Sequence, residues 1–123
     1  MGAGRTVRQG EIHWADSGDP AAGSSPGYVR PVLVLQNDVF NASRIRTVVV
    51  CALTTNLRRG KDPGNVTLVP GEGGLDEQSV VNVSQLVTLD KRDLRQRAGK
   101  LVPERMQEVL DGVDLLLKPR SLR

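Results

Sequence analysis

The stretch that decides the fold is TVVVCALT at residues 47–54, in which every residue from position 48 to 53 is apolar. A short run rich in β-branched valines predicts a strand, and its unbroken apolar character predicts a central strand covered on both faces. RPVLVLQ at residues 30–36 predicts a second buried strand. If these two strands are antiparallel neighbours, the start of one meets the end of the other, which brings Arg30 beside Thr54 at one edge of the sheet.

Short strands separated by turn residues continue on both sides of this pair. GEIHWAD at 10–16 alternates apolar with polar residues, and VTLVP at 66–70 and SVVNVSQLVTL at 79–89 add further strands. We predict a short helix in DKRDLRQRAG at 90–99, with Asp90 as its N-cap, and a last short strand at 100–102. A C-terminal helix is predicted from Pro103 to Lys118, because apolar residues recur there at helical spacing: Met106, Val109, Leu110, Val113, Leu116 and Leu117.

These elements predict a mainly β protein, built as a small curled antiparallel sheet or barrel with the C-terminal helix packed on it. Residues 1–8 and 119–123 are expected to be loose basic tails, so that a single domain covers residues 9–118. Two long polar loops, at 17–28 and 55–65, interrupt the strands. Loops of this length inside a compact domain are usually functional or disordered.

The composition argues against several classes of protein and site. The chain has 123 residues, of which 38% are hydrophobic and 25% charged, with a net charge of +3, as expected for one globular domain. No apolar run approaches the roughly 20 residues that span a bilayer. One histidine and one cysteine cannot build a zinc site, and phosphate-loop, dinucleotide and serine-hydrolase motifs are absent. We therefore expect no metal, no cofactor and no membrane association, and the lone Cys51 fits the reducing cytoplasm.

The edge shared by Arg30 and Thr54 is the candidate site. A guanidinium beside a hydroxyl can hold a phosphate through charge-assisted hydrogen bonds, although both residue types are also common structural punctuation at loop edges. The basic residues of the second loop either extend a track along a nucleic-acid backbone or form a solvated loop. These residues are Arg58, Arg59 and Lys61.

Five stretches of the sequence occur in an order that carries a family resemblance. They are GEIHWAD, AAGSSPGYVRPVLVLQND, VVVCALTTN, PGNVTLVPGEGGLDEQSVVNVSQLVTLDK and RAGKL. Together they closely resemble the MazF/PemK toxins of bacterial toxin–antitoxin pairs, from residue 9 to about residue 117. The resemblance implies an SH3-like barrel that forms a homodimer and cleaves single-stranded RNA at short sequence motifs without metal. It also implies neutralisation by an acidic, extended segment of a MazE-like antitoxin.

The resemblance also implies roles for individual residues. The functional arginine of the family falls on Arg30, its functional threonine on Thr54, and its Gly-Ser pair on Gly23 and Ser24. Many members follow that pair with an acidic residue, whereas this chain has Ser25, so a general base at that position is in doubt. The candidates for general base or acid are His13, Asp16 and Asp38.

Further contacts to RNA are expected from the two loops and the strand ends. Tyr28 either stacks on an unpaired base or packs against its own barrel, and Asn37 either caps a turn or bonds a base edge. The candidate RNA-binding residues are Gly23, Ser24, Ser25, Tyr28, Asn37, Thr55, Asn56, Arg58, Arg59 and Lys61.

The predicted reaction is attack of the RNA 2′-OH on the adjacent phosphate, which leaves 2′,3′-cyclic phosphate and 5′-OH ends and inhibits translation and growth. Well-placed intramolecular attack reaches effective molarities of roughly 10⁵–10⁸ M, so a site without metal can suffice. Two alternatives stay open. A CcdB-like gyrase-binding toxin shares the barrel but is expected to end in Trp-Gly-Ile, whereas this chain ends Ser121, Leu122, Arg123. An RNA-binding barrel without cleavage is the other.

Overall fold

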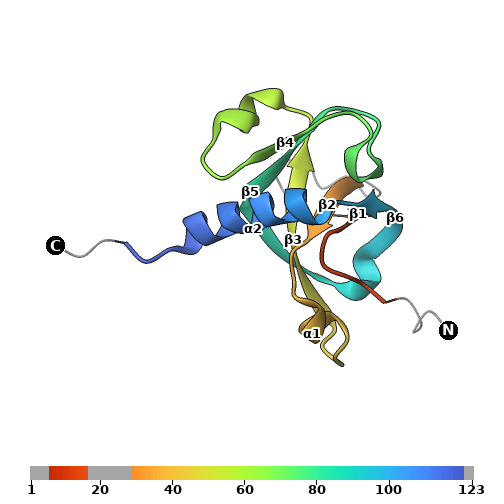
Figure 1. Cartoon of the computed structure of the whole chain (residues 1–123). Helices are drawn as coiled ribbons and strands as arrows, with labels where there is room; N and C mark the ends of the chain where they lie inside the picture. Colours follow the sequence, from red (N-terminus) through yellow and green to blue (C-terminus); the bar gives the residue numbers. More distant parts are fainter. Residues whose placement is uncertain (1–5, 17–28, 121–123) are drawn as a thin grey trace.

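The computed structural model describes residues 6–16 and 29–120, and it confirms a mainly β chain with a C-terminal helix (Figure 1). The strands are β1 (Glu11–Ala15), β2 (Arg30–Val34), β3 (Thr47–Thr54), β4 (Val66–Leu68), β5 (Ser79–Asp90) and β6 (Leu94–Lys100). The helices are α1 (Asp38–Asn41) and α2 (Pro103–Leu117), and three 3-10 turns are η3 (Leu57–Lys61), η4 (Glu72–Gly74) and η5 (Lys91–Asp93). The whole of the first long loop, residues 17–28, lies outside the described residues.

The six strands form one antiparallel sheet in the order β4-β5-β3-β2-β1-β6. Three strands separate β5 from β6 in this order, yet only the three residues of η5 connect them. So short a connection requires the sheet to curl until the end of β5 reaches the start of β6. Among the described strands the curled sheet is not closed, since β4 and β6 remain its two edges.

Strand β3 lies inside the sheet and is covered on both faces, as its apolar run predicted. On one face, Cys51 and Leu53 belong to a core that also contains residues of α2. On the other face, Val48 and Val50 pack into a second core around which the sheet curls. Val7 also packs into this second core and is only 3% exposed, so packing begins within the segment that we expected to be a loose tail.

The helix predicted at residues 90–99 is wrong. Asp90 does cap a turn, accepting a hydrogen bond from the Arg92 N–H at 2.8 Å, but the turn is only η5 and the chain then enters β6. Strand β6 pairs antiparallel with β1, and it ends at Lys100, where we had expected the last short strand to begin. The available edge of β1 therefore outweighs the local helix propensity of this stretch.

Helix α2 begins at Pro103, as predicted, and packs Met106 and Val109 into the core. Its buried Gly112 lies against Gly64 in the turn before β4. The apolar stripe was expected to be mainly core, with part of it at a subunit interface, and its last residues, Leu116 and Leu117, are 44% and 67% exposed. Figure 1 shows why, because the last turns of the helix project beyond the sheet.

Candidate functional site

The two strands that define the candidate site are antiparallel neighbours. Val32 lies opposite Ala52 and Leu33 opposite Cys51, and the same register puts the first residue of β2, Arg30, opposite the last residue of β3, Thr54. Arg30 also donates a long hydrogen bond from Nη2 to the Leu53 carbonyl oxygen, at 3.5 Å. The two residues therefore meet where β2 begins and β3 ends, as the sequence predicted.

A polar pocket of about 370 Å³ opens at this end of the two strands. Such a volume falls within the usual range of small-molecule pockets, but the lining is mostly polar and charged rather than apolar. A ligand with many hydrogen-bonding groups and negative charge fits this chemistry best. The lining residues are Arg30 on β2, Ala52 and Thr54 on β3, Arg59 and Asp62 at η3, and Asn82, Ser84 and Gln85 on β5.

The β5 side of the pocket comes from an irregularity in the pairing of β3 with β5. Cys51 lies opposite Leu86 and Leu53 opposite Val81, so β5 advances by five residues while β3 advances by two. The surplus residues of β5 form an extended bulge that leaves the regular ladder, and bulges turn side chains away from the pleat. The polar side chains at 82, 84 and 85 in this bulge line the pocket. Sequence reasoning missed these three residues, because their only signal was that they are polar within an otherwise apolar strand.

The hydroxyl of Thr54 is oriented by the loop that follows it. Its Oγ1 accepts a hydrogen bond from the Asn56 N–H at 3.1 Å, and the Asn56 side chain in turn accepts from the Arg58 N–H at 3.2 Å to cap η3. A threonine hydroxyl has two acceptor lone pairs and one O–H donor. The O–H of Thr54 can therefore donate to a ligand oxygen in the pocket while its oxygen stays anchored to the loop.

The three basic residues of the second loop are separated by the turn η3. Arg59 lines the pocket, and its Nη1 lies 3.4 Å from Oδ2 of Asp62, which lines the same pocket. Arg58 and Lys61 are exposed and do not line it. Arg59 thus adds a second guanidinium beside Arg30, whereas the other two cations lie on the outer surface of the loop.

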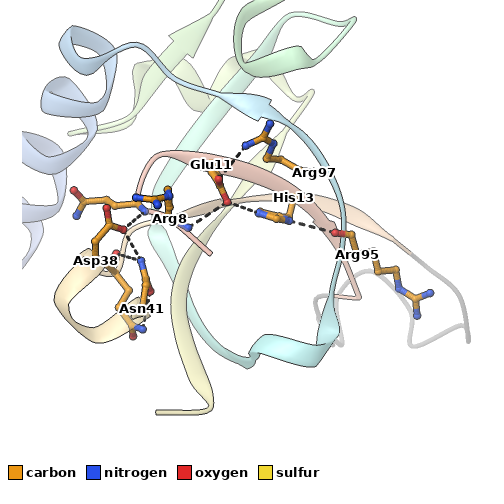
Figure 2. A network of polar contacts seen from close by, with 9 residues as sticks. Arg8, Glu11, His13, Asp38, Asn41, Arg95 and Arg97 are labelled. Atoms are coloured by element: carbon orange, nitrogen blue, oxygen red, sulfur yellow. Dashed lines mark hydrogen bonds and ion pairs between the residues drawn. The ribbon is translucent and has the colours of Figure 1, made fainter. Parts of the chain in front are cut away.

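The structure does not bring His13 to the pocket. Its side chain is buried, with Nε2 2.9 Å from Oε1 of Glu11 and Nδ1 3.2 Å from the Arg95 carbonyl oxygen (Figure 2). Glu11 also accepts hydrogen bonds from the Arg8 N–H and from Nη1 of Arg97. The network ties β1 to the edge strand β6, which is a structural role.

The acidic candidates lie at opposite ends of the sheet. Asp38 and the neighbouring Asn37 follow the end of β2, whereas Arg30 begins that strand. Asp38 accepts from the Gln9 N–H at 2.7 Å and from the Asn41 amide at 3.0 Å, and these bonds hold the pKa of Asp38 below its ordinary value of 3.8. The Asn37 side chain caps α1 by accepting from the Val39 N–H.

Asp16 is the acidic candidate nearest to the pocket edge in the register. It directly follows Ala15, which is the β1 partner of Arg30.

Thr55 is exposed beside Thr54. The other predicted contacts, Gly23, Ser24, Ser25 and Tyr28, lie outside the described residues.

Within residues 6–16 and 29–120, no group of three or more His, Cys, Asp or Glu side chains is arranged to hold a metal ion. No helix in the same part of the chain is long and apolar enough to cross a membrane. Cys51 is fully buried, and burial raises the pKa of its thiol to about 12, so the thiolate needed for nucleophilic chemistry does not form near neutral pH.

Comparison with known proteins adds to this geometry. Over 111 residues the chain is 44% identical to the endoribonuclease MazF6 of Mycobacterium tuberculosis, covering 90% of this chain and 96% of the relative. It is 34% identical over 117 residues to the endoribonuclease MazF of Staphylococcus saprophyticus, covering 95% and 96% of the two chains.

Solved structures show the same fold. A mycobacterial endoribonuclease in complex with its cognate antitoxin superimposes with a TM-score of 0.73 at 24% identity, covering 94% of this chain and 99% of that one. MazF from Deinococcus radiodurans gives a TM-score of 0.72 at 25% identity, with the same coverage. Residues 8–117 match the family model for the PemK-like, MazF-like toxin of type II toxin–antitoxin systems. The chain therefore belongs to the PemK/MazF family of toxins.

Proposed function

We propose that this toxin is a metal-independent, sequence-selective endoribonuclease that cleaves single-stranded RNA. The observation that carries the proposal is the polar pocket where Arg30, at the start of β2, and Thr54, at the end of β3, converge. A guanidinium supplies charge and a fork of donors that matches phosphate oxygens, and a threonine O–H supplies one more donor. The relatives named endoribonucleases support the same activity for this chain.

The proposed reaction uses the substrate's own nucleophile. The 2′-oxygen attacks the adjacent phosphorus, the bond from phosphorus to the 5′-oxygen breaks, and the products are a 2′,3′-cyclic phosphate and a 5′-OH. Arg30 stabilises the negative charge that builds on the phosphate oxygens, and Thr54 donates to one of them. The 2′-OH must lose a proton and the leaving 5′-oxygen must gain one. For the first transfer Asp16 is the better placed acidic candidate, because it follows the register partner of Arg30.

We also propose an RNA partner and two kinds of protein partner for this chain. Single-stranded RNA is the substrate, and Arg59 lies in the pocket where it can contact a phosphate. A homodimer and a cognate acidic antitoxin are proposed as protein partners, and a solved mycobacterial relative in complex with its cognate antitoxin supports the antitoxin. We place the activity in the cytoplasm, where messenger RNA is translated and where the unpaired thiol of Cys51 stays reduced.

The test is incubation of long single-stranded RNA with the purified protein in excess chelator, followed by mapping of the fragment ends. We expect cleavage at a short motif, with 2′,3′-cyclic phosphate and 5′-OH ends. Intact RNA at high protein concentration would overturn the nuclease proposal. Cleavage that leaves 3′-OH ends would overturn the attack by the 2′-oxygen, and an RNA with 2′-fluoro sugars serves as the uncleavable control.

A further inference from the structure

Asn65 links the second loop to the bulge of β5. Its Oδ1 accepts a hydrogen bond from the Val83 N–H at 2.9 Å, and its Nδ2 donates to the Arg59 carbonyl oxygen at 2.9 Å. A backbone N–H can only donate and a backbone carbonyl can only accept. These two backbone groups therefore fix which end of the Asn65 amide is oxygen and which is nitrogen.

The orientation of Asn65 determines the orientation of Asn82. Nδ2 of Asn65 also donates to Oδ1 of Asn82 at 3.2 Å, and the Ser84 hydroxyl donates to the same oxygen at 3.2 Å. The Asn82 carboxamide oxygen thus has two donors facing it, which matches its two lone pairs. The amide cannot turn over without placing its NH₂ group against the NH₂ group of Asn65.

What Asn82 has left for a ligand is its pair of N–H donors. The residue is half-buried and lines the pocket together with Arg30 and Thr54. Within the described part of the chain, its Nδ2 makes no hydrogen bond. A carboxamide can usually both donate and accept hydrogen bonds with a ligand. The Asn82 carboxamide can only donate, because its oxygen already accepts two hydrogen bonds within the protein.

We propose that Asn82 is a specificity-determining residue that reads the keto edge of a base flanking the scissile phosphate. This inference rests on the proposed endoribonuclease function and adds the class of base that the pocket accepts. Guanine O6 and uracil O4 are acceptors that fit a fixed N–H donor, whereas adenine N6 and cytosine N4 carry donors that would face it. Unpaired bases expose these edges, so single-stranded RNA presents what Asn82 needs.

A contact from Asn82 to a base edge favours keto bases over amino bases, which contacts to the RNA backbone cannot do. In the proposed function Arg30 and Arg59 bind phosphate groups, which every sequence shares, so they do not select a base. A well-placed hydrogen-bond pair to a base edge discriminates by roughly 1–3 kcal/mol, which corresponds to about 5- to 150-fold. A single keto oxygen belongs at the lower end, so we expect a preference of about 5- to 10-fold at one position of the motif.

The experiment first maps the cleaved motif of the wild-type protein and then removes the keto oxygen of single bases in a short substrate, with the loss of the ring N–H beside it. At each keto base next to the cleaved bond, guanine is replaced by 2-aminopurine, which lacks O6, or uracil by 2-pyrimidinone, which lacks O4. The kcat/KM of the wild-type protein should fall about 5- to 10-fold at one position. This arm uses the unaltered protein, so folding of a variant does not affect it.

The protein arm compares Asn82→Ala with Gln107→Ala, a matched loss of an exposed amide on α2 away from the pocket. Asn82→Ala should cleave the keto and atom-deleted substrates at equal rates at that position, whereas Gln107→Ala should discriminate like the wild type. Asn65→Ala, which frees the Asn82 amide to rotate, should also reduce the ratio of the two rates. Asn82→Asp should shift the preference toward amino bases.

Three outcomes would overturn the inference. They are an unchanged discrimination ratio in Asn82→Ala, a wild-type motif with only adenine and cytosine next to the cleaved bond, and equal cleavage of keto and atom-deleted substrates. If the wild-type protein cleaves no RNA, the proposed function fails by itself. The reading by Asn82 is then tested by binding of uncleavable 2′-fluoro RNA, where equal affinity for uracil and 2-pyrimidinone would overturn it.

Discussion

Replacement of Gly112 in α2 by alanine tests how closely this helix packs against the turn before β4. This residue lies in the helix interior and is buried against the turn that precedes β4. A Cβ at position 112 would collide with the Gly64 carbonyl oxygen and would lie 2.9 Å from its carbonyl carbon and 3.1 Å from its Cα. All three atoms belong to the backbone, so a change of rotamer cannot relieve the contact. Asn65, which orients the Asn82 side chain in the pocket, directly follows Gly64.

Two opposing effects set the magnitude. Alanine favours a helix interior over glycine by about 1 kcal/mol, which would stabilise the variant. Overpacking typically costs about 1–3 kcal/mol, and a contact with backbone belongs at the upper end of that range. The net effect of Gly112→Ala is therefore a loss of about 2 kcal/mol in the free energy of unfolding. For a chain of 123 residues this lowers Tm by roughly 8 °C.

The assay is thermal unfolding followed by circular dichroism at one fixed protein concentration, since association makes Tm depend on concentration. Asp114→Ala on the exposed side of the same helix is the matched control, and helix propensity alone should leave its Tm unchanged or slightly raised. An unchanged or higher Tm for Gly112→Ala would refute the close packing of α2 against Gly64.

Three further predictions address the site, the buried network and the antitoxin. Arg30→Ala and Thr54→Ala should each lose roughly 100- to 1,000-fold in RNA cleavage while keeping the Tm of the wild type, and full activity in either variant would remove that residue from the site. Burial raises the pKa of Glu11, but hydrogen bonds from His13, the Arg8 N–H and Arg97 outweigh burial and hold it below its ordinary value of 4.5. The depressed pKa contributes stability that is present above about pH 4.5 and lost as the pH falls through the folded-state value. In urea unfolding between about pH 7 and about pH 3, Glu11→Gln should be less stable than the wild type at neutral pH and should change less as the pH falls; parallel curves would contradict this. An acidic peptide from a cognate antitoxin should inhibit cleavage with an affinity that falls as salt rises, and salt-insensitive inhibition would indicate an apolar contact instead.

The sequence predicted those parts of the fold where burial and local pattern agree. The apolar run of β3 specified a strand covered on both faces, and its pairing with β2 followed from their proximity in sequence. The prediction for residues 90–99 was wrong because their local pattern resembles a capped helix. Pairing with β1, which is distant in sequence, supplies the hydrogen bonds that make most of this segment a strand. Pairing between strands that lie far apart in sequence cannot be predicted from the residues of either strand alone.

Only part of the candidate site could be predicted from the sequence, and the missing part again depends on how distant segments pair. Antiparallel register alone sufficed to place Arg30 beside Thr54. The contribution of β5 was missed, because polar residues within a mostly apolar strand do not show where its ladder will be interrupted. The sequence did not distinguish the three basic residues of the second loop, and the turn η3 determines that Arg59 is the one that lines the pocket.

The interrupted ladder between β3 and β5 has a consequence for how such a toxin can change its target. Asn82, Ser84 and Gln85 lie between the last regular pair on one side and the first on the other, so their side chains are not needed to fill the two cores. Substitutions at these three positions can alter the chemistry offered to a ligand at little cost to strand pairing. Stability and recognition are thereby assigned to different residues of one strand, and new preferences can arise there while the scaffold stays intact.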